Sequence, residues 1–205
     1  RCAGTVPGAR VLGFHLEGPF IALSKKGAQN PAYVRPGTSA EFDRLNDASG
    51  GRVKIITMAP EAFDSRDFIT HVGTCAHVSV GHTAASYEEA AAAYRQGADR
   101  ATHLFNAMTP LQHRAPGVVG AALENDRVFC ELICDGYHLA PAVVRTVFKT
   151  LGRDRAVVVS DSMKAAGLAP GKYDLGGQDV FVDEKQDVAR LGDGTIAASI
   201  TNVFQ

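Results

Sequence analysis

The sequence has almost no net charge, no long hydrophobic run and no paired cysteine motif. Its 205 residues carry a formal net charge of −1, so bulk electrostatics favour binding to neither nucleic acid nor an anionic membrane. No apolar run approaches the roughly 18 residues that a membrane helix needs, and no secretory signal opens the sequence. We therefore expect a cytoplasmic protein with no nucleic-acid or membrane partner.

The four cysteines follow neither a disulfide pattern nor a zinc-binding pattern. Cys130 and Cys134 fall in one predicted strand, where they would lie about 13 Å apart, beyond the reach of a disulfide. Cys2 and Cys75 are isolated, and the sequence contains no CxxC pair. We expect all four to be reduced thiols that pack as small hydrophobic side chains.

What the sequence does contain is a series of short apolar runs without polar alternation. Such runs, rich in β-branched residues, are typical of strands that are buried on both faces of a parallel sheet. We expect strands at residues 11–14, 53–58, 75–80, 128–134 and 156–159, and a shorter one within 101–104.

Helical patterns separate several of these runs. Ser86 opens a capping box, S-x-x-E, which predicts a helix that ends at Gly97. Pro141 suits a first helical position, and apolar residues at helical spacing then continue until Gly152 ends the helix. A third helix is expected over residues 61–72.

Strand–helix alternation implies a parallel sheet with crossover helices. We expect an α/β fold, a (β/α)8 TIM-type barrel that is incomplete in this chain, because about six of the eight strands are recognisable. Residues 1–170 would form this partial barrel. From Gly171 the pattern changes to short strands and turns, so residues 171–205 are expected to form a β-rich tail that is part of a small β module.

Three residues of metal-binding type follow predicted strands. Glu17, His82 and His103 each stand where a strand gives way to its loop, and catalytic groups gather at that end of the strands in βα barrels. Taken singly, each is better explained as a loop cap, a packed histidine or a surface residue. Together, one carboxylate and two imidazoles suit zinc or ferrous iron, which acidify water and polarise carbonyl groups.

Asp161 follows another apolar run, just after the strand expected at residues 156–159. As a base it could take a proton from water and pass it to a leaving nitrogen. The alternative is a helix N-cap for the next segment, and without the other residues the two interpretations are evenly balanced. The four residues together predict a metal-dependent hydrolase.

Further polar residues in the loops suggest a substrate with an anionic group. Asn106, Arg114 and His138 all follow predicted strands. An arginine side chain binds phosphate in a fork geometry, and amide and imidazole donors can add to it. Each residue is weak evidence alone, because a loop arginine or asparagine is usually just solvated.

Five motifs place these residues in a recognisable order. They are GFHLEGPF at residues 13–20, GHTA at 81–84, ATHLFNAM at 101–108, DGYH at 135–138 and SDSM at 160–163. In this order they resemble the N-acetylglucosamine-6-phosphate deacetylases of the amidohydrolase superfamily, and the likeness covers nearly the whole chain. The segments HLEGP and THLFNAM are quite specific, whereas the GH and SD pieces alone would not be.

The resemblance implies a reaction and a role for each residue. The reaction would be hydrolysis of the amide of N-acetyl-D-glucosamine 6-phosphate, which yields D-glucosamine 6-phosphate and acetate. The resemblance assigns a divalent metal ion, most simply Zn²⁺ with Fe²⁺ as the alternative, to three ligands: Glu17, His82 and His103. Asp161 would be the general acid and base.

The same resemblance implies how the amino-sugar phosphate is held. Asn106, the backbone of Ala107, and His138 would bind it, and Gln29 would lie near the reacting amide. Arg114 would reach the phosphate bound by a neighbouring subunit, because the site of this family is completed across a homodimer.

Two departures from the family pattern matter. Many relatives have a histidine where Gln29 stands; glutamine can still donate a hydrogen bond but cannot carry a proton. Members of the family also have an H-x-H pair on a first barrel strand, and this sequence contains no such pair.

Two alternative functions remain open at this stage. The first is an amidohydrolase that acts on another N-acyl amino sugar or a cyclic amide; a neutral substrate would not need Asn106, Arg114 and His138. The second is a non-catalytic sugar-phosphate binding protein, which should have lost a metal ligand or the base. All four of these residues are present in the sequence.

Overall fold

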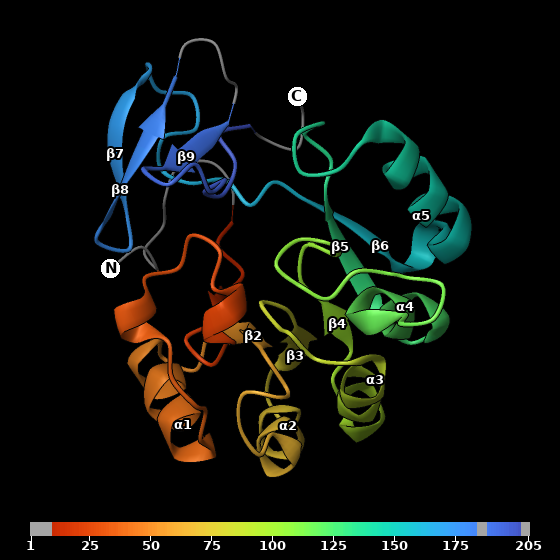
Figure 1. The fold of residues 1–205 in the computed structure, drawn as a ribbon. Helices are drawn as coiled ribbons and strands as arrows, with labels where there is room; N and C mark the ends of the chain where they lie inside the picture. The colour runs from red at the N-terminus through yellow and green to blue at the C-terminus, as the bar shows by residue number, and fades with distance from the viewer. Residues whose placement is uncertain (1–9, 184–187, 202–205) are drawn as a thin grey trace.

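The computed structural model describes residues 10–183 and 188–201, which form two sheets (Figure 1). A curled parallel sheet of six strands alternates with helices, and an antiparallel sheet of three strands follows it along the chain. Residues 1–9, 184–187 and 202–205 lie outside the described residues. They include Cys2, the beginning of the predicted barrel segment (1–170) and two parts of the predicted β-rich tail (171–205).

The six parallel strands lie side by side in the order in which they occur in the sequence. Each strand pairs with the next one along the chain, the arrangement of a βα barrel. The strands are β1 (Phe14–Glu17), β2 (Val53–Met58), β3 (His77–Val80), β4 (Arg100–Ala101), β5 (Phe129–Ile133) and β6 (Ala156–Val159).

The expected strands at residues 53–58 and 156–159 agree with β2 and β6, whereas the strand expected at 11–14 was misplaced. β1 begins at Phe14, opposite Val53, the first residue of β2. Val11 and Leu12 precede this ladder, and their side chains are 49% and 76% exposed. A strand forms only where a neighbour supplies backbone partners, so the apolar run alone did not fix the position of β1.

Three helices agree with the predictions or refine them. α3 (Tyr87–Gln96) begins with the predicted capping box, because Ser86 accepts from the backbone of Glu89 and the Glu89 carboxylate accepts from the backbone of Ser86. α5 (Pro141–Arg155) is interrupted at Gly152, whose φ is 70°. α2 (Arg66–Val72) begins later than predicted, since residues 60–64 form a turn.

Two helices were not predicted. α1 (Ser39–Ala48) begins with Thr38, whose side chain accepts from the backbone of Glu41, so a T-x-x-E signal was present in the sequence. α4 (Gly117–Glu124) is apolar on nearly every side and largely buried. A short helix of this kind has no amphipathic period to detect. Two short 3₁₀ segments, Leu23–Lys25 and Pro31–Tyr33, lie in the long connection after β1.

The main hydrophobic core lies between the parallel sheet and its helices. Phe20 and Phe42 are fully buried and pack edge-to-face on Phe68. Cys130 is also buried, and the three described cysteines are free thiols, as predicted. Cys75 and Cys134 are exposed, so the expectation that every cysteine packs in a core is wrong for these two.

The antiparallel sheet has its own small core. Its strands are β7 (Gly171–Leu175), β8 (Gln178–Val182) and β9 (Ala189–Leu191), and its buried residues include Val180, Leu191 and Met163. The turn between β7 and β8 meets the loop that follows β1. Gln178 donates to the carbonyl oxygen of Ala28 over 2.6 Å, and Asn30 donates to that of Gly176 over 3.1 Å.

Within the described residues, every helix is too short or too polar to cross a bilayer.

Candidate active site

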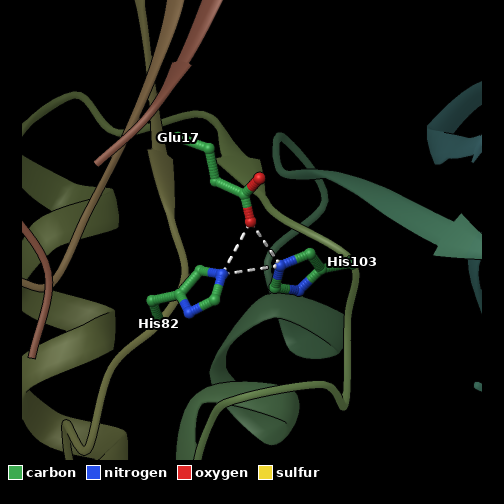
Figure 2. A group of neighbouring side chains, drawn as sticks. All are labelled: Glu17, His82 and His103. Carbon is green, nitrogen blue, oxygen red and sulfur yellow. Dashed lines mark hydrogen bonds and ion pairs between the residues drawn. The ribbon is translucent and has the colours of Figure 1, made fainter. Parts of the chain in front are cut away.

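Glu17, His82 and His103 meet at one end of the parallel sheet (Figure 2). Glu17 is the last residue of β1, while His82 and His103 follow β3 and β4 by two residues each. The Glu17 Oε1 atom lies 2.6 Å from His82 Nε2 and 2.9 Å from His103 Nε2, and the two Nε2 atoms are 3.1 Å apart. Residues that are far apart in the sequence thus present three ligand-type atoms to one point.

The backbone at the strand ends contributes to this convergence. His82, His103 and Asp161 all have positive φ angles, of 49°, 30° and 49°. Residues other than glycine rarely adopt this conformation, and it recurs at functional sites. The turn it makes directs each side chain over the end of the sheet instead of letting the strand continue.

The hydrogen bonding of His82 fits a metal ligand. Its Nδ1 atom lies 2.7 Å from the carbonyl oxygen of Lys25, which can only accept, so Nδ1 carries the proton. In the neutral ring Nε2 then has a lone pair directed at the Glu17 carboxylate, which also only accepts. A cation between these two atoms resolves the conflict, and a backbone carbonyl behind the other ring nitrogen is the usual support for a histidine ligand.

The electrostatics of Glu17 and His103 also fit a site for a bound cation. Burial would raise the pKa of Glu17, but the neighbouring His103 and His82 imidazoles outweigh it and hold that pKa well below its usual range. Burial lowers the pKa of His103, yet the hydrogen bond and the charge of Glu17 raise it overall. The site therefore stabilises positive charge beside a carboxylate, which is what a divalent cation requires.

Asp161 lies beside these three residues in a pocket of about 670 Å³. Burial, together with the charge of Glu17, raises the pKa of its carboxyl group to about 6. A carboxyl group with a pKa close to neutrality can both accept and return a proton at working pH. The segment after Asp161 is a turn and not a helix, so the alternative interpretation as a helix N-cap is wrong.

The pocket also contains most of the residues expected to bind substrate. Its lining includes Gln29, Asn106, Ala107 and His138. Gln29 donates through Nε2 to the carbonyl oxygen of Glu17 over 3.2 Å. Arg114 is exposed in the loop before α4 and is not among the residues that line this pocket.

Two residues that support the site had no assigned role in the sequence analysis. Glu61 accepts from the hydroxyl of Thr83 and the backbone N–H of Ala84, and so fixes the chain immediately after His82. Asp135 lies 2.7 Å from Nδ1 of His138. Of these two residues, only Asp135 could have been noticed in the sequence, because it stands three residues before His138 in the same loop.

A polar layer lies on the inner face of the sheet beneath the site. The hydroxyl of Thr57 lies 2.7 Å from His15 Nε2 and 2.7 Å from the hydroxyl of Thr102, which in turn lies 2.6 Å from that of Ser79. Glu131, also buried, lies 3.9 Å from His15. These bonds tie β1, β2 and β3 to the segment after β4, and so hold the strand ends that carry Glu17 and His103 in register.

Curated relatives share most of this sequence. The chain is 41% identical over 194 residues to the N-acetylglucosamine-6-phosphate deacetylase of Bacillus subtilis (strain 168), an alignment that covers 94% of this chain and 48% of the relative. It is 38% identical over 204 residues to the N-acetylgalactosamine-6-phosphate deacetylase of Escherichia coli O157:H7, which covers 99% of this chain and 53% of that protein. No family model matches the sequence.

A solved structure extends the likeness to the fold. The N-acetyl-D-glucosamine-6-phosphate deacetylase of Mycobacterium smegmatis, determined as a mutant in complex with N-acetyl-D-glucosamine-6-phosphate, aligns with a TM-score of 0.89 at 39% identity. The alignment covers 93% of this chain and 50% of the solved one. The resemblance drawn from the motifs and the predicted fold class are thereby confirmed, and the chain spans about half the length of the relatives it matches.

Proposed function

We propose that this chain is part of a metal-dependent N-acetylglucosamine-6-phosphate deacetylase, a hydrolase of amino-sugar catabolism and recycling. The observation that carries the proposal is the convergence of Glu17, His82 and His103 with Asp161 in one pocket. The sequence is about 40% identical to deacetylases that are named for this reaction. The products would be D-glucosamine 6-phosphate and acetate.

Glu17, His82 and His103 would hold one divalent cation, for which we propose Zn²⁺, with Fe²⁺ as the alternative. One carboxylate and two imidazoles are a donor set that both ions accept. When bound, such a cation supplies Lewis-acid polarisation of the acetyl carbonyl and makes water more acidic.

Asp161 would move the proton that the reaction requires. As water adds to the acetyl carbon, the carboxylate accepts a proton from it and then donates that proton to the amide nitrogen. The C–N bond breaks, acetate forms, and the amine of the sugar leaves with the proton it needs. The pKa of about 6 suits both halves of this transfer.

Asn106, the backbone of Ala107, and His138 would hold the sugar phosphate, and Gln29 would contact the acetamido group. All four line the pocket. Arg114 lies in an exposed loop outside it, which accords with the proposal that this residue acts on the phosphate in the other subunit of a homodimer.

Two further proposals concern organisation. Residues 1–170 would form the partial barrel domain and residues 171–205 would belong to the β module. The separate core of the small sheet supports two units, and Met163 and Ala165, which precede the boundary, also pack in that core. A cytoplasmic location follows from the proposed substrate, because a doubly charged sugar phosphate does not cross a bilayer unaided.

The substrate proposal predicts a strong preference for the phosphorylated sugar. Acetate release would be measured from N-acetylglucosamine 6-phosphate and from N-acetylglucosamine with the full-length protein. We expect kcat/KM to be higher for the phosphorylated sugar by roughly 100-fold or more, since two charge-assisted hydrogen bonds to phosphate are lost with the other sugar. Equal values for the two sugars would contradict the proposal, and so would release from neither.

The relative that acts on N-acetylgalactosamine 6-phosphate suggests a second candidate substrate. This sugar differs from the first only in the configuration of one hydroxyl group, so it retains both the amide and the phosphate. A higher kcat/KM for N-acetylgalactosamine 6-phosphate in the same assay would reassign the substrate while leaving the reaction unchanged.

A further inference from the structure

Lys25 ends a short 3₁₀ segment in the loop after β1 and lines the pocket of about 670 Å³. Its carbonyl oxygen accepts the Nδ1–H of His82 over 2.7 Å. Three residues earlier, the backbone N–H of Ala22 donates to the carbonyl oxygen of His82 over 2.9 Å. These two bonds to one residue fix the turn from Ala22 to Lys25, and with it the point at which the lysine side chain leaves the backbone.

The side chain of Lys25 extends from this turn to the loop after β4. Its Nζ atom donates to the carbonyl oxygen of Met108 over 3.4 Å. Asn106 and Ala107 directly precede Met108 and line the same pocket. The ammonium group therefore lies against the segment that is proposed to hold the sugar phosphate.

The charge of the pocket gives this lysine a particular weight. Lys25 is the only lysine or arginine among the described residues that line the pocket, whereas Glu17 and Asp161 bring carboxyl groups to it. A phosphate monoester carries between one and two negative charges near neutral pH. The amide of Asn106 and the backbone of Ala107 are neutral donors, so a cation is needed to offset the charge of the phosphate.

The ammonium group of Lys25 has donors to spare. It carries three N–H donors, and within residues 10–183 and 188–201 its one hydrogen bond is that to Met108. At 3.4 Å this bond is longer than the usual 2.7–3.2 Å of a strong N–H···O bond. A phosphate oxygen would be a better partner than this neutral carbonyl, because charge-assisted hydrogen bonds are about twice as strong as neutral ones.

We propose that the ammonium group of Lys25 binds the phosphate of the sugar phosphate in its own subunit, beside Asn106 and the backbone of Ala107. The inference rests on the proposed function, and it deepens that function by assigning a cation of the same subunit to the phosphate, whereas Arg114 would act across the dimer. Lys25 then serves both halves of the site: its carbonyl oxygen supports the metal ligand His82, and its side chain selects phosphorylated substrates.

The substitution Lys25→Met separates these two parts of the residue. Methionine keeps much of the length and the apolar stem of the side chain but has no charge, and the carbonyl oxygen bonded to His82 is retained. Lys26→Met is the matched control. Lys26 is the next residue, its Nζ atom donates to the carbonyl oxygen of Gly27 over 3.2 Å, and it is not among the described residues that line the pocket.

Steady-state kinetics of the full-length protein tests the proposal. We expect Lys25→Met to raise KM for N-acetylglucosamine 6-phosphate by about tenfold to a hundredfold, with kcat within about twofold, because a charge-assisted hydrogen bond to the phosphate is lost. The value of kcat/KM for unphosphorylated N-acetylglucosamine should not change, and Lys26→Met should keep the KM of the wild type. Equal KM values for the two variants, or an equal loss of Lys25→Met on both sugars, would overturn the proposal.

Calorimetry with the product glucosamine 6-phosphate measures the same contact without turnover. We expect the Kd of Lys25→Met to exceed that of the wild type by about tenfold to a hundredfold, with metal content unchanged because the bond to His82 is retained. A wild-type Kd in this variant, or a loss of metal that accompanies weaker binding, would refute the phosphate contact. Absence of acetate release from every sugar would contradict the proposed function instead, and the calorimetry would still decide this inference.

Discussion

Replacement of Asp161 by asparagine is expected to lower kcat by roughly 10²- to 10⁴-fold, the contribution of a positioned general acid and base. Asparagine has nearly the same shape but cannot accept and return a proton. The Glu17, His82 and His103 side chains do not change, so metal content should equal that of the wild type. Acetate release and metal content would be measured on the same samples.

The control for this variant is Asp179→Asn, the same chemical change at an exposed residue of β8 that pairs with Lys172. This variant should keep the full rate. Wild-type kcat in Asp161→Asn would refute the assignment of the base. Loss of metal together with activity would show that the residue acts as a ligand.

The pH profile follows from the same carboxyl group. Asp161 must be deprotonated to accept a proton, and its pKa is raised to about 6 by burial and by the charge of Glu17. A bound cation favours the carboxylate and lowers this value, so kcat/KM should fall as the pH drops through 6 or somewhat below. This acidic limb should be absent from the residual activity of Asp161→Asn.

Replacement of His82 by glutamine is expected to lower metal affinity by more than about 100-fold, because loss of a supporting partner alone costs roughly 10- to 100-fold and here the ligand itself is lost. Glutamine cannot reproduce the Nδ1–H bond to Lys25 together with a donor atom beside Glu17. Metal titration of the apoprotein would measure the affinity, and acetate release should disappear at metal concentrations that saturate the wild type.

The chain offers a matched control on β3, the strand that precedes His82. His77 begins β3, at the opposite end from His82, and bonds to Asp99 over 2.6 Å. His77→Gln removes an imidazole of the same kind and should keep the metal affinity of the wild type. Equal affinities for the His82 and His77 variants would show that the three-residue cluster is not the metal site.

Sequence patterns predicted the sheet better than the exact limits of its strands. Parallel strands that alternate with helices are continuous apolar runs, which is why β2 and β6 agree with their predictions, although β6 lies at the edge of the described sheet and is only partly buried. β1 is set by its neighbour β2 and therefore differs from its own apolar run by several residues. The two-residue strand β4 (Arg100–Ala101) overlaps the short run expected at residues 101–104 only at Ala101.

The ligand cluster was predictable because each residue ends a strand, and parallel strands bring their ends together. Glu61 was not predictable in the same way, and for Asp135 the sequence showed only that it shares a loop with His138, since each acts through a hydrogen bond set by loop geometry. Glu61 contacts residues more than twenty positions away, and no local sequence pattern predicts such a contact. The roles of the supporting residues could therefore be recognised only in the structure, whereas the metal ligands could be predicted from the fold class.

Acetate release from N-acetylglucosamine 6-phosphate, before and after removal of metal, tests the central claim most directly. The full-length protein would be treated with a chelator, freed of it, and supplied with Zn²⁺ or Fe²⁺ in turn. We predict that chelation abolishes release and that one of the two ions restores it. Release that persists in verified metal-free protein, or none with either ion restored to the cluster of Glu17, His82 and His103, would contradict the account.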